Sequence, residues 1–306
     1  MERKISFADL QKAVDEAYEN FKSEKAGTVD PRLTEVKPDT FGISVMLTDG
    51  RSVNKADADT LFPLTQVAKV PLSVVLLTQN SPSELVKKSG KCACKGARKE
   101  KPQVPFSPHG IRAVSAVVPQ GDPEGKYGVI LNSLLALTSG EPVLNDKLFQ
   151  TLKAQAVSDD VVNKLAQADY TLYDDAQLSV DTYLKLMSLQ LSAKQLATLG
   201  ATIAADGRNP LTGEYAFDGS IAASVVALMA ESGHCKRSIM MRTGLPGKGG
   251  FSGAYLAVLP GFGAIAVYSP EVDEFGKSVK GLQTIEYIAN KLGLNVFASA
   301  RVEVEK

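Results

Sequence analysis

The chain has 306 residues, of which 44% are hydrophobic and 22% charged, the composition of a globular protein with a sizeable core. Its 34 basic and 34 acidic residues cancel, so no overall field favours nucleic acid or an anionic membrane as a partner. It has no run of about 18 apolar residues that would predict a membrane span, and its first residues lack the apolar core of a signal peptide. Three cysteines are too few for a disulfide framework, so we expect a cytoplasmic protein.

The first part of the chain predicts a helix, a pair of strands and a second helix. Apolar residues recur at helical spacing over 7–22. Residues 41–47 alternate in a strand pattern, and Asp49-Gly50 predicts a turn into a second strand. The apolar run 62–77 predicts a buried helix that starts near Thr65.

The segment from Val86 to Lys101 is crowded with lysine and arginine and contains Cys92-Ala-Cys94. A zinc site there would need two further ligands, for which only His109, His234 and Cys235 remain. We therefore expect no bound metal. Because no aromatic residue interleaves the basic side chains, the segment is more typical of a solvated loop than of a nucleic-acid surface.

The sequence predicts mainly helices for the rest of the chain. Proline and glycine indicate a loop-rich connection over 102–128. Helices are expected over 145–167, 174–191, 192–205, 220–229 and 277–292. Because strands gather at both chain ends, we expect one α/β unit. In it about 1–64 and 196–306 build an antiparallel sheet, and about 65–195 form a helical part.

A glycine-rich stretch near the C-terminus contains Lys248. Two apolar runs follow it, 254–259 and 264–268, and the Pro-Gly-Phe-Gly between them predicts a β-hairpin. Glycines before the hairpin let the backbone pass close to another group. A lysine that enters a strand from such a turn is often aimed across a pocket, and a solvated loop lysine is the alternative.

Lys69, after the early strand pair, and Lys248, before the late hairpin, together suggest a serine-acylating hydrolase. Such enzymes carry S-x-x-K at a helix start, where the amine deprotonates the hydroxyl on the same face. A late K-[ST]-G strand supplies a second cation and an oxyanion donor.

The chain is similar to bacterial-type glutaminases of the β-lactamase-like superfamily. The segments that carry the resemblance are Phe41-Gly-Ile-Ser-Val45, Asp57-Ala-Asp59 with Phe62, Leu196-Ala-Thr-Leu-Gly-Ala-Thr-Ile-Ala-Ala205, Asn209-Pro-Leu-Thr212, Gly244-Leu-Pro-Gly-Lys248, Ala257-Val-Leu-Pro-Gly261 and Leu292-Gly-Leu-Asn-Val-Phe297. The resemblance implies a β-lactamase-like fold and a homo-oligomer. It also implies hydrolysis of L-glutamine to L-glutamate and ammonia through a serine acyl-enzyme, without a cofactor.

The chain departs from the family pattern at the nucleophile. Where the family has a serine three residues before the helix lysine, this chain has Gln66-Val-Ala-Lys69. A carboxamide is not a nucleophile, so we expect the family reaction to be absent or much reduced. The family's K-S-G is here Lys248-Gly249-Gly250, without the hydroxyl.

Further pocket positions also differ. Met241 stands where the family has a tyrosine, and the family's glutamate and asparagine for the glutamine head group fall at Leu152 and Asp159. The family's V-N-A-G stretch has no counterpart near residues 127–135. Tyr183 corresponds to the family's first catalytic tyrosine, and a core aromatic is the alternative reading of it.

The candidate site follows from these positions. Lys69 and Tyr183 are the predicted catalytic groups. Gln66, Tyr183, Lys248 and Phe251 are the predicted ligand-binding residues, with backbone N–H groups near 66 and 251 as an oxyanion hole. The expected ligand is a small amide or amino acid. Two alternatives stay open: an active amidohydrolase with Thr65 as nucleophile, and a non-catalytic module that binds a partner through the basic segment.

Overall fold

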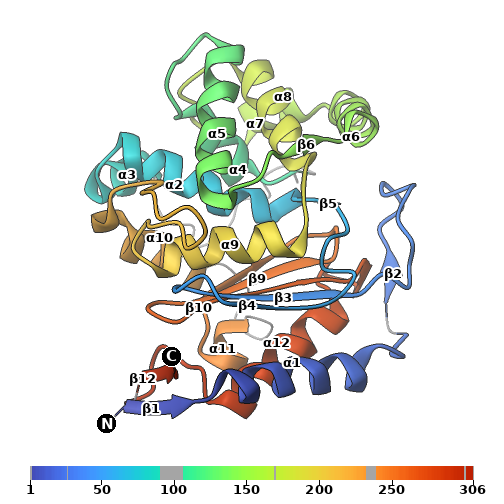
Figure 1. Cartoon of the computed structure of the whole chain (residues 1–306). Coiled ribbons are helices and arrows are strands. Elements are labelled where there is room, and N and C mark those ends of the chain that lie inside the picture. Colours follow the sequence, from blue (N-terminus) through green and yellow to red (C-terminus); the bar gives the residue numbers. More distant parts are fainter. Residues whose placement is uncertain are drawn as a thin grey trace.

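A five-stranded antiparallel sheet built from both chain ends lies at the centre of the protein (Figure 1). Its strand order is β4-β3-β10-β9-β8. The strands are β3 (Gly42–Leu47), β4 (Ser52–Ala56), β8 (Gly247–Gly249), β9 (Ala254–Leu259) and β10 (Gly263–Tyr268). The structure is a computed structural model that describes residues 2–25, 27–89, 106–168, 170–231, 239–299 and 301–305. The predicted hairpin of β9 and β10 is confirmed.

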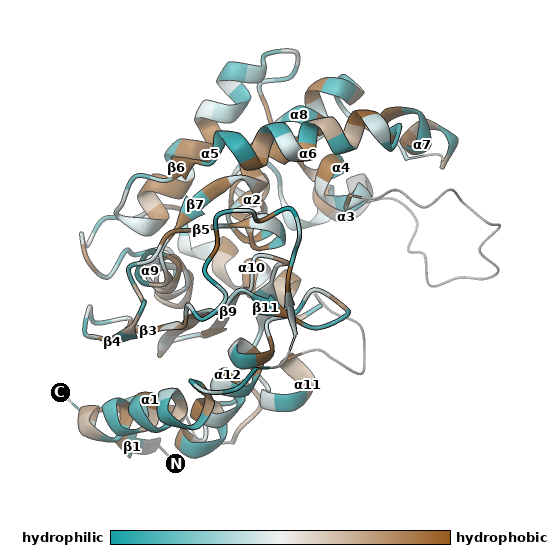
Figure 2. Cartoon of the chain, turned by 90° about the vertical axis from the view of Figure 1, so that its right-hand side faces the viewer, coloured by the Kyte–Doolittle hydropathy of each residue, from teal (hydrophilic) through white to brown (hydrophobic). Residues whose placement is uncertain are grey.

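Helices cover both faces of this sheet, as Figures 1 and 2 show. On one face α1 (Phe7–Phe21) packs against α12 (Val279–Leu292), and on the other α9 (Ala193–Ala204) crosses β3, β9 and β10. A Cβ on Gly200 of α9 would come 2.4 Å from the Cβ of Ala264. The helix therefore lies this close to the sheet only because residue 200 has no side chain.

Alternate residues of the central strands feed two hydrophobic cores. Ile265 and Val267 of β10 point to the core beneath α1 and α12. Ala264, Ala266 and Tyr268 belong to the second core, which continues through α9 into the helical layer. This period of two explains why every residue of β10 is buried.

The helical layer stands beyond α9 (Figure 1). It begins with the 3-10 turn η1 (Thr65–Ala68) and consists of α2 (Lys69–Gln79), α3 (Pro82–Ser89), α4 (Pro108–Ser115), α5 (Pro123–Thr138), α6 (Asp146–Ser158), α7 (Val161–Gln167) and α8 (Ala176–Met187). A small sheet with the order β5-β7-β6 connects it to the rest, formed by β5 (Phe62–Pro63), β6 (Val143–Leu144) and β7 (Leu189–Leu191).

The remaining elements lie at the margins. They are β1 (Glu2–Ile5) paired in parallel with β12 (Arg301–Val304), β2 (Thr28–Val29) paired with β11 (Glu271–Val272), η2 (Gly219–Ile221), α10 (Ala222–Ala230) and α11 (Ile239–Thr243). Within the described ranges, no helix is both long enough and apolar enough to span a membrane.

Several predicted boundaries are wrong for identifiable reasons. The expected loop over 102–128 contains α4 and α5, because Pro108 and Pro123 stand at the start of these helices, where proline is favoured. The expected helix over 145–167 is two helices, since the chain turns at Asp160, which has a φ of 51°. The helix expected over 174–191 ends at Met187, and β7 follows it.

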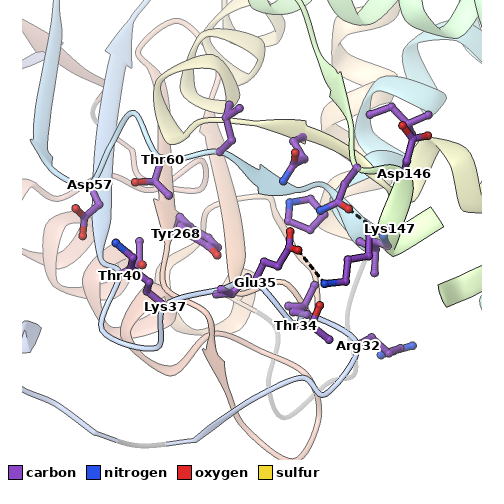
Figure 3. A pocket seen from close by; sticks show the side chains of 18 residues that line it. Arg32, Thr34, Glu35, Lys37, Thr40, Asp57, Thr60, Asp146, Lys147 and Tyr268 are labelled. Atoms are coloured by element: carbon purple, nitrogen blue, oxygen red, sulfur yellow. Dashed lines mark hydrogen bonds and ion pairs between the residues drawn. The ribbon is translucent and has the colours of Figure 1, made fainter. Parts of the chain in front are cut away.

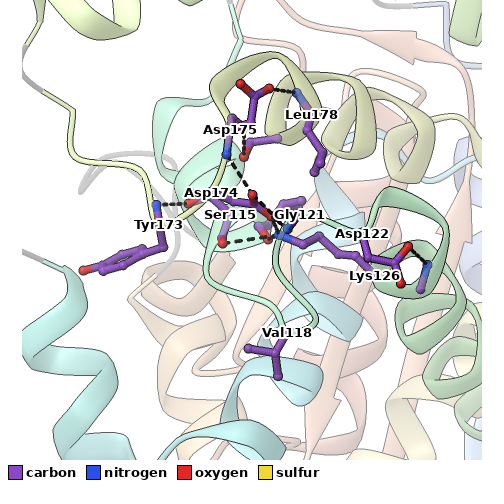
Figure 4. A network of polar contacts seen from close by, with 12 residues as sticks. Ser115, Val118, Gly121, Asp122, Lys126, Tyr173, Asp174, Asp175 and Leu178 are labelled. Atoms are coloured by element: carbon purple, nitrogen blue, oxygen red, sulfur yellow. Dashed lines mark hydrogen bonds and ion pairs between the residues drawn. The ribbon is translucent and has the colours of Figure 1, made fainter.

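A buried ion pair joins three helices of the layer (Figure 4). The Lys126 ammonium on α5 donates to Asp174 Oδ2 at 2.5 Å and to the carbonyls of Val114 and Ser115, both at 3.3 Å. The Asp174 carboxylate, just before α8, also accepts the N–H of Gly121. This network fixes the end of α4 relative to α5 and to the start of α8.

Candidate functional site

The predicted lysine of α2 meets a serine that the sequence analysis did not single out. Lys69 is the first residue of α2, and its Nζ donates to Ser107 Oγ at 2.5 Å. Ser107 caps α4, and its Oγ also accepts the N–H of Gly110 at 3.3 Å. A Ser-Pro pair before an apolar run is a helix-start signal, and it was the one indication that Ser107 is held in a defined place.

Three lysines of this region influence one another. Burial lowers the pKa of Lys69 to about 7, with further contributions from the charges of Lys248 and Lys277. Burial, together with Lys277, lowers the pKa of Lys248 to about 8. In the part of the chain that the structure describes, no ion pair joins Lys69 or Lys248 to a carboxylate. Burial also lowers the pKa of Lys277, so the region is a cluster of largely buried amines whose pKa values are all lowered.

Tyr183 of α8 lies against the same serine. Its side chain is fully buried, and a Cβ on Gly110 would come 2.4 Å from its Cζ and 2.5 Å from its hydroxyl oxygen. Burial raises its pKa far above the usual value, while its nearness to Ser107 acts weakly in the other direction. No contact of the Tyr183 hydroxyl with another described residue has full hydrogen-bond geometry. The structure thus brings Lys69, Ser107 and a neutral phenol together.

Gln66 and Phe251 form a second, adjoining pair. The Phe251 N–H donates to Gln66 Oε1 at 2.9 Å. The Arg32 guanidinium lies 3.8 Å from the centre of the Phe251 ring and pairs with Asp30 at 2.6 Å. The backbone N–H predicted as a donor at residue 251 is therefore already hydrogen-bonded to the side-chain carbonyl of Gln66.

The Thr65 hydroxyl contacts Ser252. This buried hydroxyl is 3.3 Å from Ser252 Oγ, and the φ of Thr65 is 47°, a left-handed conformation. Residues 65–68 form a 3-10 turn, so the α-helix that was expected to start near Thr65 starts only at Lys69. No described hydrogen bond connects the two side chains.

The other positions at which the family resemblance implies a substitution lie in different elements. Leu152 is fully buried in the core of the helical layer, and Asp159 is the C-cap residue that follows α6. Met241, on α11, is 76% exposed.

A polar cavity of about 520 Å³ lies beside the site (Figure 3). Its wall contains Arg32 and Tyr268, and the Glu35–Lys147 ion pair crosses it at 2.8 Å. The lining does not include Lys69, Ser107, Tyr183 or Lys248. Arg32, which also stacks on Phe251, connects the cavity to the candidate site.

The basic segment, in which no bound metal is expected, lies only partly within the described residues. Val86–Ser89 belong to α3, where a loop was expected, whereas Cys92, Cys94, His234 and Cys235 lie outside the described residues. Among the described residues, no group of three or more histidine, cysteine or acidic side chains is arranged to hold a metal ion.

Comparisons with known proteins bear on the whole chain. A family model described as Glutaminase matches residues 25–297. A glutaminase of Bacteroides thetaiotaomicron is 33% identical, covering 97% of this chain and 98% of that protein. Glutaminase 1 of Escherichia coli O6:H1 is 31% identical, covering 94% and 97%.

Solved structures agree with the sequence comparison. A probable glutaminase, YbaS, has a TM-score of 0.86 and 29% identity, covering 96% of this chain and 100% of that one. The Bacillus subtilis glutaminase YbgJ, solved in covalent complex with 5-oxo-L-norleucine, has a TM-score of 0.79. The match covers 95% of this chain and 99% of that one, and at 20% identity it shows a shared fold. The chain therefore belongs to the glutaminase family and has the β-lactamase-like fold of its members.

Proposed function

We propose that this protein binds a small amide or amino acid and lacks, or has only a small remainder of, glutamine hydrolysis through a serine acyl-enzyme. The observation that carries the proposal is Gln66 at the expected nucleophile position, with its Oε1 on the Phe251 N–H. The carboxamide nitrogen shares its lone pair with the carbonyl, so Lys69 cannot turn it into a nucleophile. In a hydrolase with a catalytic triad, loss of the nucleophile alone lowers the rate by about 10⁶-fold.

The same contact affects ligand binding. Gln66 presents a primary carboxamide oxygen to the donor that would hold the carbonyl of a bound amide. A ligand that uses the Phe251 N–H must displace it, which costs about 1 kcal/mol, the net worth of one hydrogen bond. Gln66 therefore competes with a weak ligand but does not exclude a strong one.

The charges near the site support an anionic group in the ligand. Lys69, Lys248 and Lys277 place positive charge there, and Asp273 is the acidic residue that acts on Lys277. A carboxylate such as that of an amino acid would offset the repulsion between these amines.

The test combines binding with covalent capture. The melting temperature of the protein is measured with glutamine, glutamate and asparagine, and we expect at least one of them to raise it. The protein is then treated with 6-diazo-5-oxo-L-norleucine, the reagent that gave the covalent complex of the Bacillus subtilis glutaminase. We expect no adduct at residue 66. An adduct there, or no shift with any of the three ligands, would contradict the proposal.

The two alternatives receive less support. The Thr65 hydroxyl is directed to Ser252 and has no described contact with an amine that could activate it. The basic segment that a binding partner would use lies largely outside the described residues.

We also propose a cytoplasmic homo-oligomer, as the family resemblance and the small number of cysteines suggest. Light scattering on the purified protein tests the oligomer, and a single mass of 32.5 kDa would contradict it.

A further inference from the structure

The strongest group outside the proposed function is the pair of Ser107 and Lys69. We propose that Ser107 is a nucleophile and Lys69 its general base, so that the protein forms an acyl-enzyme at residue 107 rather than at residue 66. The inference goes beyond the proposed function, which concerns glutamine and position 66.

The geometry of the pair is that of an activated serine. Nucleophile and base must lie within hydrogen-bond distance, and Lys69 Nζ is 2.5 Å from Ser107 Oγ. The second contact of this oxygen is the N–H of Gly110, which donates to it and so stabilises negative charge on it. Ser107 is partly exposed, so a small reagent can reach it.

The position of Ser107 is fixed from three sides. It caps α4, it adjoins the Tyr183 ring of α8, and the Lys126–Asp174 pair holds α4 and α8 together. A nucleophile needs such a rigid frame, because misplacement by about 1 Å costs about 100-fold in rate.

The reaction balances with these two groups and water. Ser107 Oγ attacks the carbonyl carbon of an ester or amide while its proton passes to the Lys69 amine. Collapse of the tetrahedral adduct breaks the bond to the leaving group, which takes that proton. Water then donates a proton to Lys69, its oxygen attacks the acyl carbon, and Ser107 leaves with the proton. The positive charges of Lys248 and Lys277 nearby favour small acyl compounds that carry a carboxylate.

The protonation state of Lys69 makes this chemistry available near neutral pH. Its pKa is lowered to about 7 by burial and by the charges of Lys248 and Lys277. His109 of α4 has its own pKa lowered, first by burial and then by Lys69, and buried Tyr183 stays neutral. Because only the free amine is a base, reactivity is expected to rise with pH and to reach half its maximum near pH 7.

The full-length protein is treated with diisopropyl fluorophosphate, a reagent that reacts with activated serines and releases fluoride. Intact mass is followed over time from pH 5.5 to 9, and the label is located by peptide mass spectrometry. We expect one adduct, on Ser107, that forms with a midpoint near pH 7. Lys69→Arg keeps the charge but removes the base, and we expect it to react at least about 100-fold more slowly.

Matched variants separate chemistry from folding. Ser107→Asn retains a good helix cap and has no hydroxyl, so it is expected to fold and to stay unlabelled. Ser73→Ala removes a serine of α2 whose hydroxyl donates to the Val70 carbonyl, and it should label like wild type. No label on the wild type, a label on another residue, or an unchanged rate in Lys69→Arg would overturn the inference. None of these readouts depends on glutamine, so failure here and failure of the proposed function are distinguishable.

Discussion

Replacing Lys126 by Met is expected to destabilise the protein strongly. The Lys126 side chain is 0% exposed and that of Asp174 only 6%, so their ion pair is shielded from water. Methionine keeps most of the apolar stem but removes the charge, which leaves the Asp174 carboxylate buried with backbone donors alone. Breaking a buried pair in this way costs about 3–5 kcal/mol, and the long contacts to Val114 and Ser115 place our expectation near 3 kcal/mol.

The pH dependence gives a second signature of the pair. Burial would raise the pKa of Asp174, but the Lys126 ammonium and the N–H groups of Asp175 and Gly121 outweigh it and hold the pKa below its usual value. A lowered pKa in the folded state stabilises the fold above the usual aspartate pKa, and this contribution is lost as pH falls through the folded-state pKa. Stability that depends on the pair should therefore decline below about pH 4.

Urea unfolding, followed by circular dichroism, measures the free energy of unfolding for the wild type, Lys126→Met, Asp174→Asn and the double variant. The double variant should lose less than the sum of the two single ones, because it leaves no unpaired charge. A loss below about 1 kcal/mol in Lys126→Met, with an unchanged denaturant slope, would refute the view that this pair locks the helical layer.

Three further changes test the site. Gly110→Ala should lower the free energy of unfolding in urea by about 1–3 kcal/mol and slow the labelling of Ser107, because the added Cβ would come 2.4 Å from Tyr183 Cζ. An unchanged labelling rate would count against that packing. Gln66→Ala should tighten the binding of small amides by up to about tenfold in calorimetry, because it frees the Phe251 N–H. Gln66→Ser alone should not restore rapid ammonia release from glutamine, because the family resemblance places Leu152, and no carboxylate, beside the α-ammonium group. The variant is assayed beside Gln66→Ser with Met241→Tyr, and rapid turnover by the single variant would show an intact pocket.

The sequence predicted the central sheet well, because its signals are local. Alternating apolar residues at 41–47 and the Pro-Gly-Phe-Gly turn at 260–263 act over a few residues, and β3 with the β9–β10 hairpin confirms them. The boundaries of the helical layer were less predictable. In the sequence, Pro108 and Pro123 resemble loop signals although each begins a helix, and only the preceding caps distinguish the two cases.

The composition of the site could be predicted only in part. Motif spacing pointed to Lys69 and Lys248, and the family resemblance pointed to Tyr183. Ser107, however, is 38 residues from Lys69, and no periodicity connects the two. Likewise, the sequence predicted the Phe251 N–H as a donor but not its acceptor. That acceptor is the Gln66 side chain, 185 residues away, and the contact forms because η1 packs against β8 and the turn after it. Contacts of this kind come from tertiary packing, on which local sequence carries little information.

Ammonia release from glutamine by tag-free wild-type protein tests the central claim most directly. The assay compares native protein at micromolar concentration with the same sample after heat denaturation. We predict equal rates, because our proposal places Gln66 where the acyl-enzyme would form, and its carboxamide oxygen accepts the Phe251 N–H. Turnover of glutamine that scales with the concentration of native enzyme would contradict this account.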